Sequence, residues 1–224
     1  TRHINRMKGL LASQGVVMEI GAEFKEAIGK VRLWDGSGIP GRLRKRLERE
    51  YERMEVLKQQ IRQLEKEREE LMRTSQEEAV EQVRRLLQLK GIGVNSAWLY
   101  VMEFFAWRGF RNRREEGALA GLTPTPYQSG ESAKECGISK AGNRPVRGMA
   151  IEVACLRQYR RYRWAWLRNQ PDSALSRWYD QRFAKGSSRV RRIGIVALAR
   201  KLLIELWKYL ETGVVPEGAY LKSS

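Results

Sequence analysis

The sequence predicts an all-α protein: a long coiled-coil or helical-hairpin segment, followed by a compact helical domain with a helix-hairpin-helix-like element. Residues 41–73 place apolar side chains at alternating steps of three and four. Beyond residue 77, helical periodicity recurs between turns rich in Gly and Pro, and no segment alternates convincingly as a strand. We therefore expect a leading segment at residues 1–40, a coiled coil at 41–76 and a C-terminal domain at 77–224.

The leading segment is expected to contain two short helices. Residues 1–15 place apolar side chains on one helical face and stop at Gly15. That face consists of Ile4, Met7, Leu10 and Leu11. A second short helical segment is expected around Phe24, Ile28, Val31 and Leu33, followed by a loop at "WDGSGIPG".

The predicted coiled coil has a narrow apolar seam between faces of dense mixed charge. The seam positions are Leu43, Leu47, Met54, Leu57, Ile61, Leu64 and Leu71. Glu50 and Arg68 interrupt the seam, and the run "EKEREE" is expected to be a solvated face. So narrow a stripe needs a partner helix, which is either another protomer or another part of the same chain. We expect a homo-oligomer through this segment.

A helix-hairpin-helix-like element is predicted in "LQLKGIGVNSAWLYVMEF". Gly91 and Gly93 permit a tight hairpin between two helices, with the small Ala97 packing against the first. Backbone amides at the start of the second helix can then face a phosphate. An ordinary helical hairpin would have the same pattern.

Two loops are expected next. The first is "RGFRNRREEGALAGL" (Arg108 to Leu122) and the second is "GLTPTPYQSG" (Gly121 to Gly130), whose two prolines and two glycines exclude a regular helix. Ser129 is the hydroxyl residue just before the last glycine of the second loop. From the residues alone it is either a nucleophile or, more simply, a serine in a turn.

The rest of the C-terminal domain is predicted to be helical. The second half of residues 137–170 forms a helix, residues 171–183 begin a second one at Asp172 or Ser173, and a final long helix ends at Gly213. The residues expected to pack inward are Met149, Ile151, Val153 and Leu156, then Ile193, Val196, Leu203, Ile204 and Leu206. We expect most Trp side chains to lie in the core and most Arg side chains on the surface.

Positive charge is concentrated in the C-terminal part of the chain. The formal net charge of the 224 residues is +17, of which +3 belongs to residues 1–80 and +14 to residues 81–224. Such a field favours a polyanionic partner, most simply nucleic acid. The alternative is a ribosome-like or merely soluble basic protein. The candidate binding residues are Gly91, Gly93, Lys134, Lys140, Arg144, Arg147, Arg157, Arg160, Arg161 and Arg163; the last four lie among aromatic residues that are either stacking platforms or core.

Several kinds of site are unexpected from composition. The chain has two cysteines, Cys136 and Cys155, one histidine, His3, and only three aspartates. These cannot form a zinc set, a histidine-based triad or a metal site of hard oxygen ligands, so no metal and no cofactor is expected in this chain. No run of about 20 apolar residues is present, and the free thiols suit a reducing cytoplasm.

Four stretches together resemble the C-terminal domain of one transposase family. They are "LKGIGVNSAWLYVMEF", "GLTPTPYQSGES", "GISKAGNRPVRGMAIEVA" and "IGIVALARKLLIELWKYLETGVVPEGA", and the resemblance covers roughly residues 80–220. The family is insertion-sequence family one-ten, with its one-eleven-eleven subgroup. "NRMKGLLASQGV" near the start is similar to the family's junction before its coiled coil.

The resemblance implies a recombinase. Members carry a RuvC-like domain with four acidic residues, then a coiled coil, then the transposase domain. They exchange DNA strands at short target cores, guided by a structured element-encoded RNA called bridge RNA. The family pairs a metal-bound acidic cluster with a serine before glycine in a proline-containing loop, which corresponds here to Ser129. The implied location is the prokaryotic cytoplasm, in association with the nucleoid.

The chain departs from this pattern at its start. The RuvC-like domain would precede Thr1, so we expect a decayed or split copy or part of a longer protein, with Mg²⁺ required only when that domain is present. A serine hydroxyl needs a base, a metal or dense positive charge to attack phosphate. Lys134, Lys140, Arg144 and Arg147 lie nearby in sequence, and Ser132 and Ser139 are rival hydroxyls.

Three functions remain open from the sequence. The first is a DNA recombinase (transposase) fragment that binds DNA and guide RNA and is inactive alone. The second is a non-catalytic nucleic-acid-binding remnant, and the third is a coiled-coil assembly protein, against which the clustered arginines argue.

Overall fold

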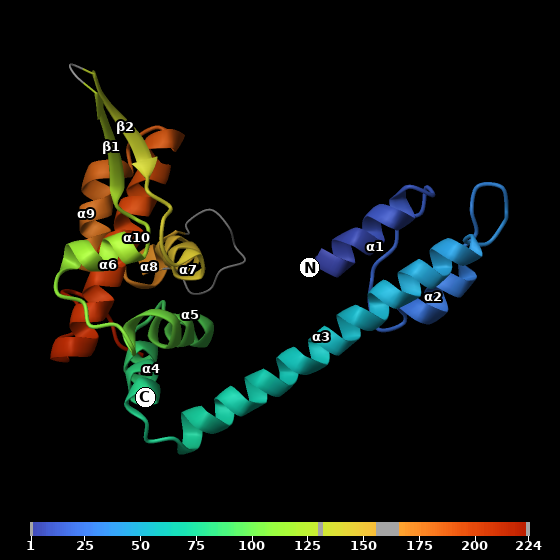
Figure 1. Ribbon diagram of the computed structural model, residues 1–224, viewed down its shortest axis with the longest axis horizontal. Coiled ribbons are helices and arrows are strands. Elements are labelled where there is room, and N and C mark those ends of the chain that lie inside the picture. Colours follow the sequence, from blue (N-terminus) through green and yellow to red (C-terminus); the bar gives the residue numbers. More distant parts are fainter. Residues whose placement is uncertain (1, 130–131, 156–165, 223–224) are drawn as a thin grey trace. The chain divides into compact units, whose positions relative to one another are not determined.

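A computed structural model describes residues 2–129, 132–155 and 166–222, and it divides into two compact units (Figure 1). Residues 1–74 form the N-terminal unit and residues 75–224 form the C-terminal unit. Each has its own buried core.

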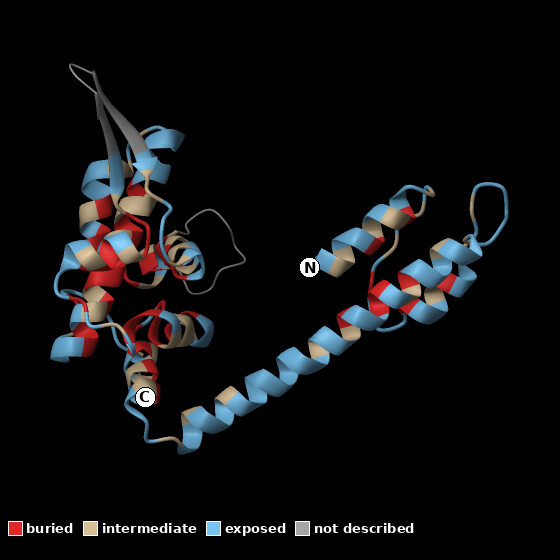
Figure 2. Ribbon diagram, in the orientation of Figure 1, coloured by how far each residue is buried: buried red, intermediate tan, exposed pale blue. Residues whose placement is uncertain are grey.

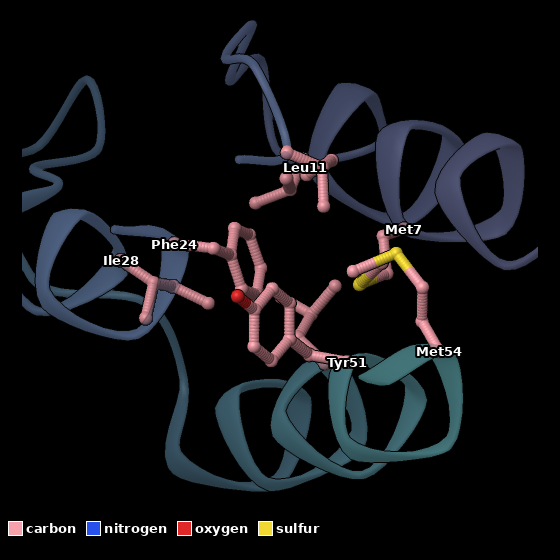
Figure 3. Packing of buried hydrophobic residues seen from close by; sticks show 8 residues of the cluster. Met7, Leu11, Phe24, Ile28, Tyr51 and Met54 are labelled. Carbon is pink, nitrogen blue, oxygen red and sulfur yellow. The ribbon is translucent and has the colours of Figure 1, made fainter. Parts of the chain in front are cut away.

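Three helices build the N-terminal unit: α1 (Arg2–Ala12), α2 (Phe24–Lys30) and α3 (Gly41–Thr74). Figure 3 shows the core where side chains from all three helices meet. The Phe24 ring stacks on Tyr51 with ring centroids 5.1 Å apart, and the Tyr51 hydroxyl donates to the carbonyls of Gly21 and Ala22. Met7 and Leu11 of α1 are buried, so the helix predicted from their spacing is confirmed.

Helix α3 is one uninterrupted helix of 34 residues rather than a helical hairpin. Its first half is buried at Leu47 and Met54 against the two shorter helices, so part of the same chain supplies that partner. After Met54 the helix is solvent-exposed in the single chain (Figure 2). Leu57, Ile61 and Leu64 are 43%, 52% and 63% exposed. A coiled coil over this second half therefore stays a prediction.

The C-terminal unit is built around its last helix, α10 (Ser188–Thr212), which packs on helices α4, α6, α7 and α9. The other elements are α4 (Glu78–Gln88), α5 (Val94–Tyr100), the π-helical segment η1 (Val101–Phe105), α6 (Arg113–Leu119), α7 (Arg144–Ala154), α8 (Trp166–Asn169) and α9 (Ala174–Phe183). The mostly helical fold is confirmed over the described residues.

The prediction that no strand is present was wrong. Strands β1 (Pro124–Ser129) and β2 (Ser132–Ile138) pair antiparallel. Proline excludes a helix interior, but each strand of a two-stranded sheet has a free edge. An N–H that points away from the partner is not needed for pairing, so Pro124 and Pro126 are tolerated.

The predicted loop at residues 108–122 was also wrong in part, because it contains α6. Asn112 starts this helix by accepting hydrogen bonds at its side chain from the Arg114 and Glu115 amides. Asparagine is among the strongest helix N-caps, and the loop prediction did not use this local signal.

The predicted core was correct in part. Ser173 is the N-cap of α9, and Gly213 ends α10 with a positive φ of 73°. Leu203, Ile204 and Leu206 are buried, whereas Ile193 is 55% exposed. Of the Trp side chains that the structure describes, only Trp166 is fully buried, so the expectation that most are core was wrong.

Candidate functional site

Ser129 is the last residue of strand β1. In the register of the hairpin it lies opposite Ser132, the nearer of the two rival hydroxyl residues. Gly130 and Glu131, which join the strands, lie outside the described residues. The candidate serine thus belongs to a paired strand next to the hairpin turn, and not to the irregular loop that its glycines and prolines suggested.

The base of this hairpin is held by hydrogen bonds to the last residue of α6 and to the segment that follows it. The Ser139 amide donates to the Thr123 carbonyl over 2.8 Å, and the Lys140 amide donates to the Gly121 carbonyl over 3.2 Å. One turn away, the Asn143 amide donates to the Leu119 carbonyl over 2.9 Å. These bonds attach the base of the hairpin, and therefore the strand that carries Ser129, to the helical part of the unit.

Three of the predicted cationic residues lie just before α7 or in its first turn. Asn143 caps α7 by accepting from the Val146 amide, which places exposed Arg144 at the first position of the helix. Lys140 is also exposed, whereas Arg147 is half-buried and donates to the Ala120 carbonyl over 3.3 Å. We call Lys140, Arg144 and Arg147 the α7 cation group. Lys140 and Arg144 form no ion pair with another described residue, whereas Arg147 also contacts the chain after α6.

The remaining predicted cations lie elsewhere or outside the described residues. Lys134 lies on β2 and pairs in register with Tyr127. Arg157, Arg160, Arg161 and Arg163 fall at 156–165, outside the described residues.

The Gly-Ile-Gly turn joins α4 to α5 as predicted. Gly91 has a φ of 89°, which favours glycine, and Ile92 and Ala97 are completely buried. The Gly93 amide donates to the Ser96 hydroxyl over 3.0 Å, so this amide already has a partner. Whether the element acts as a helix-hairpin-helix stays a prediction.

The C-terminal tail covers part of this turn. The Lys90 amide donates to the Tyr220 carbonyl, and the Lys222 ammonium donates to the Ile92 carbonyl. Buried Gln170 donates from its side-chain nitrogen to both the Lys90 and Tyr220 carbonyls, each over 2.8 Å. Gly91 is buried, whereas Lys90 before it and Val94 and Asn95 after the turn are exposed.

Sequence reasoning missed a buried acid, Glu116 of α6. Its side chain is completely buried, and neither carboxylate oxygen has a hydrogen-bond partner among the described residues. Desolvation by burial raises the pKa of Glu116 to about 8, although the nearby Arg200 charge opposes the rise. No signal in "RREEG" distinguishes Glu116 from Glu115, which is only half-buried.

Two features are absent from the part of the chain that the structure describes. No group of three or more His, Cys, Asp or Glu side chains there could hold a metal ion. No helix there is both long and apolar enough to cross a membrane.

A transposase family model matches the segment that contains the hairpin and the α7 cation group. The matching model is that of the Transposase IS116/IS110/IS902 family, and it covers residues 83–170. Residues 83–170 are therefore similar to the transposase domain of that family.

Two curated relatives extend the similarity along the chain. A putative transposase y4rJ of Sinorhizobium fredii (strain NBRC 101917 / NGR234) is 41% identical over 232 residues, which cover 99% of this chain and 56% of that protein. A transposase for insertion sequence element IS1328 of Yersinia enterocolitica is 26% identical over 211 residues, covering 94% of this chain and 58% of that protein. The chain spans slightly more than half the length of these relatives.

Proposed function

We propose that the C-terminal unit acts on DNA during transposition and that Ser129 is its nucleophile. The observation that carries this proposal is the family match over residues 83–170, which includes Ser129, the hairpin and the α7 cation group. The fixed base of the hairpin supports it, because a nucleophile must be held in a defined geometry.

The chemistry is a phosphoryl transfer. The Ser129 oxygen would attack a backbone phosphorus and lose its proton. One phosphate ester bond would form and one would break, and the departing DNA hydroxyl would take up a proton. The free cations Lys140 and Arg144 suit the charge on the non-bridging oxygens, where positive groups stabilise the transition state.

We propose that the reaction also needs a RuvC-like domain. By resemblance, a RuvC-like domain would hold Mg²⁺ with its acidic residues, and an element-encoded guide RNA would select the DNA. The described residues of this chain offer no metal-binding group, so no step here is assigned to a metal. We also propose that the transposase belongs to the one-eleven-eleven subgroup of the family.

The test is a covalent adduct assay on labelled DNA. The purified chain with Mg²⁺ should bind DNA and form no adduct that survives denaturation. Fusion of a RuvC-like domain from a related transposase ahead of Thr1, together with the guide RNA, should produce one. Ser129→Ala in the fusion should remove the adduct while DNA binding stays within about twofold, because one neutral hydroxyl adds little to binding driven by counterion release.

Ser132→Ala is the matched control, since Ser132 lies opposite Ser129 in the register. It should retain the adduct. An adduct that persists in Ser129→Ala and disappears in Ser132→Ala would show that Ser132 on β2, and not Ser129, is the nucleophile.

A second candidate function is a non-catalytic nucleic-acid-binding remnant. The absence of a metal-binding group among the described residues favours it. In that case the fusion would bind DNA as tightly as the chain alone and still form no adduct.

A further inference from the structure

Helices α9 and α10 form a tight helical pair outside the segment matched by the transposase family. Four residues, 184–187, separate the end of α9 from the start of α10, and Ser187 caps α10. The pair is in close contact at Gly194, where an added Cβ atom would lie 2.4 Å from the Phe183 ring. Because a side chain at position 194 would overlap the Phe183 ring, only glycine permits this close approach of the two helices.

The start of α10 stands clear of the core. Every residue from Ser187 to Ile193 is exposed, and burial begins only at Gly194. A helix at the surface of a globular domain normally buries an apolar stripe along its length. The first turns of α10 instead present all their faces to solvent.

Positive charge gathers at this exposed end. Residues 173–204 contain eight Lys and Arg residues and one acid, Asp180. Seven of these eight cations are exposed; one of the seven, Arg177, pairs with Glu217, and another, Lys201, lies further along α10. The other five are Arg182, Lys185, Arg189, Arg191 and Arg192. None of the five forms an ion pair with another described residue. We call these five residues the α9–α10 cation corner.

We propose that the α9–α10 cation corner binds the phosphate backbone of duplex DNA, as a surface separate from the α7 cation group. This inference rests on the proposed function and names a second contact for the same partner. Unpaired like charges repel one another, and phosphates relieve that repulsion while releasing counterions.

The corner favours a duplex over a single strand. Proteins that bind single strands stack bases on exposed aromatic rings. The aromatic ring beside the corner, Trp178, is half-buried, with the Lys201 ammonium 4.7 Å and the Arg182 guanidinium 5.9 Å from its ring centre. It is therefore not a free stacking platform.

The corner also favours DNA over duplex RNA. A short helix, a four-residue turn containing Gly186 and a second helix with an exposed basic start are the parts of a helix-turn-helix. The major groove of B-form DNA admits a helix, whereas that of A-form RNA is too narrow and deep.

The test compares two double variants of the full chain that lose the same charge. Arg189→Gln/Arg192→Gln changes the corner, and Arg42→Gln/Arg46→Gln changes exposed positions of α3 in the N-terminal unit. Binding to a labelled DNA duplex of about 20 base pairs, and to an RNA duplex of the same length, is measured by fluorescence anisotropy at several salt concentrations. All four positions are exposed, so thermal unfolding should be unchanged and serves as the folding control.

The corner variant should bind duplex DNA at least about tenfold more weakly, with the log–log salt slope reduced by about 1.8 for two lost phosphate contacts. The α3 variant should stay within about twofold of the unchanged chain. Equal weakening in both variants, or none in the corner variant, would overturn the corner while leaving the proposed function intact. Weakening confined to an RNA duplex would overturn DNA as the partner. Failure of the unchanged chain to bind any nucleic acid would instead overturn the proposed function.

Discussion

At the scale of single residues, Glu116 shows how burial changes the state of an acid. Its carboxylate lies in the interior of the C-terminal unit without a hydrogen-bond partner among the described residues. The Arg200 charge lowers its pKa and the Glu205 charge raises it, but desolvation is the largest effect. The folded unit therefore favours the protonated, neutral form of Glu116 up to about pH 8.

Glu116→Gln should therefore stabilise the C-terminal unit in a pH-dependent way. The folded pKa lies above the unfolded value, so the contribution of Glu116 is fully present below about pH 4.5 and is lost as pH rises through about 8. Relative to the Gln variant, the free energy of unfolding of the unchanged chain should fall by up to about 1.4 kcal/mol per pH unit in this window.

Urea unfolding of both proteins at pH 5 and pH 8 measures this difference, since the titration of other groups largely cancels between them. A difference in unfolding free energy that is the same at both pH values would show that Glu116 is not neutral in the fold.

Glu50 explains an interruption in the seam that the sequence left unexplained. The buried carboxylate accepts hydrogen bonds from His3 over 2.8 Å, Arg6 over 3.0 Å and Arg53 over 3.1 Å. The His3 bond is the main reason why the pKa of Glu50 is lowered, and the Arg6 bond and charge add to it. The seam position holds an acid because α1 and α3 supply its partners, and such long-range contacts are invisible to periodicity.

At the scale of elements, helical periodicity predicted those helices that bury one apolar face in a core. Helices α1 and α10 follow this pattern, and Ser173 and Gly213 mark helix ends through local capping chemistry. The β-hairpin was missed because its strands lack the alternation of a half-buried sheet. Its existence depends on pairing between residues 124–129 and 132–138, for which a single strand gives no signal.

For the candidate site, the sequence placed Lys140, Arg144 and Arg147 near one another because they lie within eight residues on a turn and a helix start. It did not reveal that Gly91 is buried, because the residues that cover the Gly-Ile-Gly turn lie far along the chain. The exposed start of α10 was missed for a related reason: Ile193 matches the apolar spacing, but the core does not extend far enough to reach it.

The exposed second half of α3 should join two copies of the chain. Leu57→Lys/Ile61→Lys places charges on its apolar stripe, so a dimer or larger assembly held there should dissociate. The molar mass from light scattering should then fall to that of the monomer, while the control Gln59→Lys/Gln63→Lys, on the opposite face, keeps the original mass. An unchanged mass in both variants would show that the stripe does not hold copies together.

At the scale of the whole molecule, structure and charge are divided at the same place. Along the chain, the boundary between the two compact units lies between residues 74 and 75. Residues 75–224 contain 26 Lys and Arg against 14 Asp and Glu, whereas residues 1–74 contain 17 against 12. The positive field thus belongs mainly to the unit that carries both cation groups, and the N-terminal unit adds little to it.

Residues 75–224 alone should therefore bind DNA with a steep dependence on salt. Each phosphate contact contributes about −0.9 to the slope of log affinity against log salt, so several contacts should give a slope steeper than about −3. Gel shifts or anisotropy at increasing salt measure it, with residues 1–74 as the control that should bind weakly. Binding that is indifferent to salt would contradict a nucleic-acid role for the charge.

The contact of Lys222 with Ile92 joins residues 130 positions apart. A ribosome adds about 5–20 residues per second, so roughly 7 to 26 seconds separate the emergence of the Gly-Ile-Gly turn from that of its cover. During synthesis the carbonyls of Lys90 and Ile92 are hydrogen-bonded to water until Gln170 and Lys222 have been added to the chain. The cover of this turn is therefore complete only after both residues have emerged, and a nascent chain that stalls before residue 220 leaves the Ile92 carbonyl without its Lys222 partner.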